Sequence, residues 1–286
     1  MANEQHLEVF RAGVHTWNQW RIDNPHEKID LSDIITEPDI DLVGINLSGA
    51  SLMFARIGAG YMALADLSGA FLMGADLTNT VLSGTNLERA HLSGADLSWA
   101  TMVGVTLRDA NLREANLQHA RLPQANLRKA TLSQANLAGA VMLGSDLSEA
   151  NLDEATLRLV NLNGADLSYA SLVEADLNTA FLSGAVFYRA NLSRARLTWS
   201  SIKGTDFSQA DLTNADLGWA TIENTDFYGA KLLGTNFFHA QISETDFLGV
   251  DVSAAKRLEY TPSAKTQRAA KSRRAERLQR GFDLGE

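Results

Sequence analysis

An apolar residue recurs at every fifth position of this chain from Leu42 to Val252, and the series never slips. Each of these positions holds Leu, Ile, Met, Phe or Val, and a small or compact residue, most often Ala, stands two positions earlier. A period of five fits neither the α-helix, with about 3.6 residues per turn, nor the β-strand, whose side chains alternate in twos. We therefore expect the chain to turn a corner every five residues, with the apolar and small residues pointing inward and the other three facing solvent.

Four such segments close one coil, because the same core residue returns at steps of twenty. The residues that show this most clearly are Phe187, Phe207, Phe227 and Phe247, together with Ile202, Ile222 and Ile242. Steps of fifteen or twenty-five give no such columns. Residues 41–252 are thus predicted to form an all-β solenoid of about eleven coils, about 50 Å long at a strand spacing of about 4.8 Å.

The individual units resemble a known family. Ala65-Asp66-Leu67-Ser68-Gly69 and Ala135-Asn136-Leu137-Ala138-Gly139 look like the A(D/N)LXX unit of the pentapeptide repeat proteins. The resemblance implies a right-handed quadrilateral β-helix with turn-like corners. It implies no single function, because known members include DNA mimics that act on DNA gyrase and cyanobacterial regulators of cell differentiation. Gyrase-protecting members carry loops that project from the coil, whereas the frame of residues 41–252 is uninterrupted.

The segments before the repeat are expected to cover its open end. Residues 4–21 carry apolar side chains at helical spacing, Asn3 is a suitable N-cap, and Asn24-Pro25 should end the helix. Because a solenoid end exposes apolar side chains and strand edges, residues 1–28 are predicted to be a capping helix, with docking of an outside partner as the alternative. Residues 29–40 are expected to be an entry segment with a register break, since Leu31 lies eleven residues before Leu42.

The segment after the repeat is basic. Residues 253–286 hold nine Lys and Arg against four Asp and Glu, a balance of +5, which leaves −14 on the remainder of a chain with net charge −9. Thr261-Pro262 favours a helix start and Gly281 a stop. The apolar residues between them are small, so we expect a loosely held C-terminal helix or a tail.

Composition also predicts where the protein acts. The chain has no Cys, no apolar run long enough for a transmembrane helix and no signal-peptide pattern at its start. These features favour a cytoplasmic protein with no membrane contact.

Two sets of outward residues form the candidate protein-contact surface. Trp199, Trp219 and His239 stand in one column and should stack in solvent, which marks an interface unless the rings shield each other or the C-terminal segment folds over them. Asp206, Asp226 and Asp246 stand in another, on the side richest in Asp and Asn. Such residues commonly bond backbone groups at corners; the functional alternative is a negative stripe that resembles a phosphate backbone.

No pattern in the sequence points to catalysis. The six His are scattered, and we find no phosphate-binding loop, nucleophile elbow, dinucleotide fingerprint or calcium-binding repeat, so no catalytic residue, cofactor or metal is assigned. The preferred hypothesis is a non-enzymatic scaffold that binds another protein through its rod surface, with a homodimer contact left open. The alternative is a DNA-mimicking modulator of DNA gyrase or another topoisomerase; direct nucleic-acid binding is expected only through the basic tail.

Overall fold

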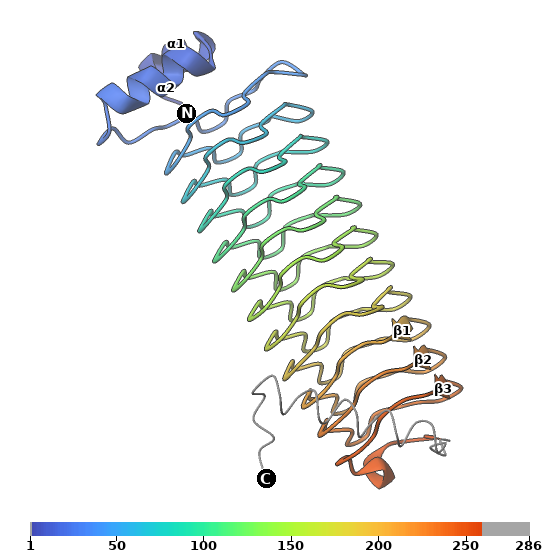
Figure 1. Cartoon of the computed structure of the whole chain (residues 1–286). Coiled ribbons are helices and arrows are strands. Elements are labelled where there is room, and N and C mark those ends of the chain that lie inside the picture. The colour runs from blue at the N-terminus through green and yellow to red at the C-terminus, as the bar shows by residue number, and fades with distance from the viewer. Residues whose placement is uncertain (1, 259–286) are drawn as a thin grey trace.

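The structure, a computed structural model, describes residues 2–258 and is a rod of stacked coils (Figure 1). Each five-residue unit consists of a short parallel bridge and a turn. Asp66, for example, pairs with Asn86 of the next coil, and the N–H of Ala70 donates to the carbonyl of Leu67 at 3.0 Å. Bridges between residues twenty apart continue along the rod, so each backbone segment between the two ends is held by the coils before and after it.

The inward positions form one continuous core. Ala65 and Leu67 are 1% and 0% exposed, and their equivalents along the rod are buried in the same way. The predicted phenylalanine ladder is confirmed, since successive ring centroids lie 4.9, 5.2 and 5.0 Å apart (Phe187, Phe207, Phe227 and Phe247). The coil of four five-residue sides that the sequence predicted is therefore present.

Each coil has four faces, which we name in chain order by one inward residue of each. These residues are Ile202 for face A, Phe207 for face B, Leu212 for face C and Leu217 for face D. A face returns every twenty residues. Three parallel strands mark face A near its C-terminal end in Figure 1, namely β1 (Ser201–Lys203), β2 (Thr221–Glu223) and β3 (Gln241–Ser243).

Two helices, not one, precede the coil. The expectation of a single helix over residues 4–21 is wrong, because α1 (Glu4–Arg11) and α2 (Val14–Asp23) are separated at Gly13. Gly13 has φ 97°, a backbone conformation that no helix contains. The predicted N-cap is confirmed, since the Asn3 side chain accepts hydrogen bonds from the backbone N–H groups of residues 5 and 6.

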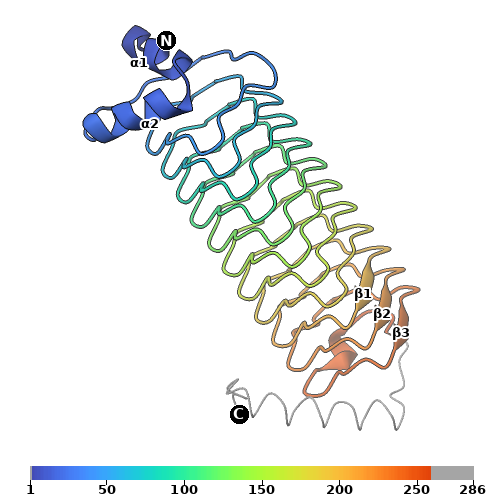
Figure 2. The ribbon, with the colours of Figure 1, turned by 45° about the horizontal axis from the view of Figure 1, so that its top comes forward.

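Helix α2 lies on the first coil (Figure 2). Trp17 is fully buried, and its indole N–H donates to the carbonyl of Asn46 at 2.6 Å. Two further side chains of α2 donate to neighbouring carbonyls, Asn18 to Gly44 at 2.9 Å and Arg21 to Ser48 at 2.8 Å. No earlier coil precedes this part of face B, so we infer that α2 takes the place of a missing coil and bonds its open edge.

The entry segment already belongs to the stack. Asp30 pairs with Ser51 and Ile35 with Arg56, both at an offset of 21 residues, whereas Asp41 pairs with Tyr61 at 20. One extra residue is thus accommodated between residues 35 and 41, where the sequence predicted a register break. Paired coils begin at residue 30, before the expected start at 41.

The other end of the described chain is less well covered. Val252, expected to point inward, begins the short 3-10 helix η1 (Val252–Ala254) and is 43% exposed. Ile242 and Phe247 are only partly buried, because no described coil lies beyond them. The stack continues as far as a bridge between Asn236 and Lys256. The predicted helix over residues 264–280 lies outside the described residues.

Candidate interaction surface

Trp199 and Trp219 stack on the corner between faces D and A. Their ring centroids are 4.9 Å apart with planes at 8°, as the twenty-residue step predicts. His239 continues the column, with its ring centroid 4.3 Å from that of Trp219. Trp199 remains 61% exposed and Trp219 43% exposed. The structure therefore brings these three predicted residues together as a ridge in solvent.

The backbone beneath this ridge is strained. Each five-residue unit turns through a residue with positive φ, and at many corners this residue is Gly, as at Gly184 with φ 68°. Trp199, Trp219 and His239 occupy the same turn position with φ of 61°, 61° and 56°. A left-handed conformation costs a residue with a side chain about 1–2 kcal/mol. Most corners of the rod hold a residue other than Gly in this conformation, so the cost is shared along the rod and is not specific to the ridge.

The C-terminal border of the ridge is formed by Phe238 and Arg257. The ring of Phe238 lies edge-on to Trp219 at 6.0 Å, and the Arg257 guanidinium lies 4.4 Å from the Phe238 ring centroid. This cation–π contact holds the segment after η1 beside the ridge. Within the described residues it does not bury the two tryptophans, as their exposure shows.

A second aromatic pair stands on the same corner, and the sequence analysis missed it. The rings of Trp99 and His119 are stacked at 4.3 Å, and His119 lies against the backbone of Gly139. Both residues precede Trp199 by multiples of twenty, so the column rule could have found them. We call the corner residues Trp99, His119, Leu159, Thr179, Trp199, Trp219 and His239 the aromatic edge.

The predicted acidic column lies elsewhere. Bridges join Asp206 to Asp226 and Asp226 to Asp246 on face B, so face A separates them from the aromatic edge. Asp226 and Asp246 are only 6% and 5% exposed. Each of the three carboxylates accepts a backbone N–H two residues later, at 2.8 to 2.9 Å. This hydrogen bond is that of an Asx turn, so the three carboxylates stabilise the backbone at their corners.

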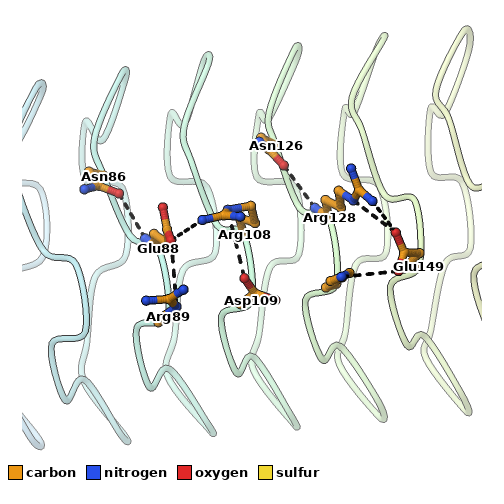
Figure 3. A network of polar contacts seen from close by, with 9 residues as sticks. Asn86, Glu88, Arg89, Arg108, Asp109, Asn126, Arg128 and Glu149 are labelled. Carbon is orange, nitrogen blue, oxygen red and sulfur yellow. Dashed lines mark hydrogen bonds and ion pairs between the residues drawn. The ribbon is translucent and has the colours of Figure 1, made fainter.

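Charges on the corner between faces B and C pair with one another (Figure 3). Arg108 contacts Glu88 and lies 3.9 Å from Asp109, while Glu149 contacts Arg128 and lies 3.5 Å from Lys129. The hydrogen bond from Arg128 holds the pKa of the Glu149 carboxyl below its ordinary value. Within this corner column Lys129 and Glu149 pair directly, and the neighbouring column supplies the other partners, Glu88, Arg108 and Arg128. This part of the rod therefore presents no continuous negative stripe.

Residues 2–258 contain no group of three or more His, Cys, Asp or Glu side chains placed to hold a metal ion. None of the helices described is both long enough and apolar enough to span a bilayer. The rod therefore presents a rigid surface with an apolar ridge and paired charges, and such a surface is suited to the recognition of another molecule.

Comparison with known proteins agrees with this architecture. The family model for pentapeptide repeats matches the chain in eight copies within residues 63–227. Among solved structures, HetL, a pentapeptide repeat protein involved in heterocyst differentiation regulation from the cyanobacterium Nostoc sp. strain PCC 7120, is 30% identical. The match covers 87% of this chain and 98% of HetL, with a TM-score of 0.36.

Two further structures are similar over different lengths. Trypsin-treated QnrB1, a plasmid-mediated fluoroquinolone resistance protein, is 16% identical over 85% of this chain and 98% of its own, with a TM-score of 0.34. Rfr23 from the cyanobacterium Cyanothece 51142 is 32% identical over 35% of this chain and 58% of its own, with a TM-score of 0.18. No curated protein matches the chain.

The matched repeats lie where the structure has its twenty-residue coils. Membership implies the right-handed, four-sided β-helix that the repeat units suggested. The chain belongs to the pentapeptide repeat family.

Proposed function

We propose that this protein is a non-enzymatic scaffold that binds another protein through the aromatic edge of its rod. The observation that carries the proposal is the solvent-exposed stack of Trp199 on Trp219. Contiguous exposed apolar patches mark interaction sites, and Trp is enriched at the energetic hot spots of protein interfaces. The absence of Cys from the whole chain favours a reducing compartment, so we place this activity in the cytoplasm.

The stack of the two rings offsets only part of the backbone cost at their corners. Their stack contributes about 0.5–1.5 kcal/mol, whereas the left-handed backbone beneath each ring costs about 1–2 kcal/mol relative to an unstrained residue. Glycine would avoid that cost, but most corners of the rod hold another residue at positive φ, so the cost is general along the rod. The exposure of the two adjacent rings, and not the backbone strain beneath them, therefore supports contact with a partner.

The test is partner capture with the intact protein and a double variant, Trp199→Ser with Trp219→Ser. A matched control carries Phe54→Ser and Tyr169→Ser, two exposed aromatic residues at left-handed corners on other edges of the rod. We expect the partner set of the intact protein to be lost with the first variant and kept with the control. An unchanged partner set in the tryptophan variant would exclude the aromatic edge as the contact.

The balance of −14 on residues 1–252 favours one alternative, a DNA mimic that modulates DNA gyrase. QnrB1, which shares the repeat, is described as a fluoroquinolone resistance protein. Burial of Asp226 and Asp246 and the paired corner charges weigh against this alternative. A supercoiling assay separates the two proposals: no effect on gyrase at micromolar protein removes the mimic. The molar mass in solution decides whether the partner is a second copy.

A further inference from the structure

Face A differs from the other faces in charge. At its outward positions between residues 61 and 184, Arg121 is the only charged residue, whereas the equivalent positions of face B over residues 66–189 carry eleven. Several large apolar side chains are exposed on face A instead, among them Val103 at 41%, Leu143 at 40% and Phe181 at 46%. Arg121 is exposed and has no ion pair within residues 2–258. Between residues 61 and 184 face A is thus an apolar surface with one unpaired cation, and farther along the face Lys203 is paired with Glu223 at 2.7 Å.

The two borders of face A also differ. The corner toward face B is Gly at most coils, and a Cβ built at Gly104 or Gly144 would meet no atom within 4 Å. This border is therefore flat and open. The opposite corner is the aromatic edge, on which Trp99, Trp199 and Trp219 stand exposed at 58%, 61% and 43%. Face A from residue 101 to residue 221, with the aromatic edge as its wall, forms what we call the shelf.

An added β-strand cannot occupy the shelf through backbone hydrogen bonds. The backbone groups along face A already bond neighbouring coils: Phe181 donates to Val160 at 2.9 Å, and Leu182 donates to Ser201 at 2.9 Å. Strand addition requires unpaired N–H and C=O groups at a sheet edge, which in this rod occur at the ends of the stack and not on its faces. The occupant must therefore satisfy its own backbone and bind through side chains, as an α-helix does.

The size of the shelf fits such a helix. Six coils at about 4.8 Å each give a length of about 29 Å, which a helix of about 19 residues spans at about 1.5 Å per residue. A helix with apolar residues at i, i+3, i+4 and i+7 can lay that stripe on Leu143 and Val103 and against the tryptophan wall. Arg121 lies one coil from the residue-101 end of the shelf, so its charge selects a carboxylate near one end of the helix.

We propose that the shelf binds an amphipathic α-helix of another protein, with an apolar stripe of about five turns and one acidic residue opposite Arg121. The inference rests on the proposed scaffold function and adds the kind of partner segment and the face that receives it.

The experiment uses the full-length protein and two displayed libraries of 20-residue peptides. One library keeps the apolar spacing of a helix, and the other alternates apolar and polar residues as a strand does. We expect the helical library alone to yield binders, and their Kd to rise at least tenfold with Leu143→Glu on the shelf. The matched variant Leu233→Glu, at an equivalent exposed position of face C, should leave the Kd within twofold.

A second shelf variant keeps the test independent of folding. Arg121→Glu changes only an exposed charge, so it should fold normally, and it should weaken binders that carry an acidic residue near one end of the helix at least tenfold. Recovery of strand-like binders only, recovery of no binders, or helical binders insensitive to both shelf variants would overturn the proposal. So would a dimer that Leu143→Glu converts to a monomer, because a second copy would then cover the shelf. If peptide selection fails while partner capture still depends on Trp199 and Trp219, the scaffold function stands without the helix.

Discussion

The contact between α2 and the first coil leads to a prediction about where the rod loses stability. Trp17 is fully buried, and its indole N–H donates to the carbonyl of Asn46. Replacing a buried Trp by Ala costs about 3–5 kcal/mol, and the carbonyl left without its donor adds about 1–3 kcal/mol. Trp17→Phe should cost less, because the ring still fills most of the space and mainly the hydrogen bond is lost.

The loss should be local, because each coil of a solenoid contacts only its neighbours. A weakening of at least about 3 kcal/mol corresponds to roughly a hundredfold rise in local opening. We therefore expect amide hydrogen exchange to quicken at least about a hundredfold in residues 41–60 of Trp17→Ala and far less around residues 140–160.

Hydrogen exchange read by mass spectrometry on the full-length protein gives this profile. Trp219→Ala, an exposed residue at the opposite end, is the matched control and should leave residues 41–60 unchanged. An equal rise in exchange along the whole rod, or no rise near α2, would refute the reasoning that α2 replaces a missing coil.

Three further predictions concern the core, the aromatic edge and acid stability. Phe207→Ala removes a buried ring that stacks on both neighbours, and should lower the free energy of unfolding by about 3–5 kcal/mol in urea titration. Trp199→Gly exchanges the stack for an unstrained corner, so its free energy of unfolding should stay within about 1 kcal/mol of the original while partner binding falls. The hydrogen bond from the Ser32 backbone N–H lowers the pKa of the Asp30 carboxyl in the folded protein. The ionised carboxylate therefore stabilises the fold above the ordinary Asp pKa of about 3.9, and this contribution is lost as the pH falls through the lowered pKa of the folded state. Asp30→Asn should therefore show a weaker loss of melting temperature below about pH 4 than the original protein; an identical acid profile would contradict this.

Periodicity in the sequence was sufficient to predict the coil, because it assigns every inward position. It also placed Trp199 on Trp219, since residues twenty apart must be neighbours once the coil closes in four segments. The twenty-residue step also predicts two further placements that the sequence analysis above does not state. Trp99 and His119 share that column, and Asp206 follows Trp199 by seven residues, which places it beyond face A on face B.

Features outside the repeat were harder to predict for physical reasons. Apolar spacing over residues 4–21 runs through Gly13 without interruption, and one Gly costs a helix only about 1 kcal/mol, so the pattern does not reveal the break. The break is determined by docking of the two helices. Trp17 of α2 is buried against the first coil, while the backbone N–H of Asn3, which caps α1, donates to the carbonyl of Asp30 in the entry segment. At the other end, the period extends to Val252, but burial of that residue needs a following coil, which periodicity does not guarantee.

The four faces of this rod meet the same folding requirements, and this equivalence bears on function. Every face supplies one inward apolar residue, one small inward residue and a turn, and none of these requires a particular charge at the outward positions. A fold that needed only solubility would therefore distribute charge over all four faces. Between residues 61 and 184 face A carries one charge, where face B carries eleven over residues 66–189, and the largest exposed rings border face A. The coil does not require this difference between faces. We therefore infer that binding of a partner, and not folding, accounts for the low charge of face A and for its aromatic edge.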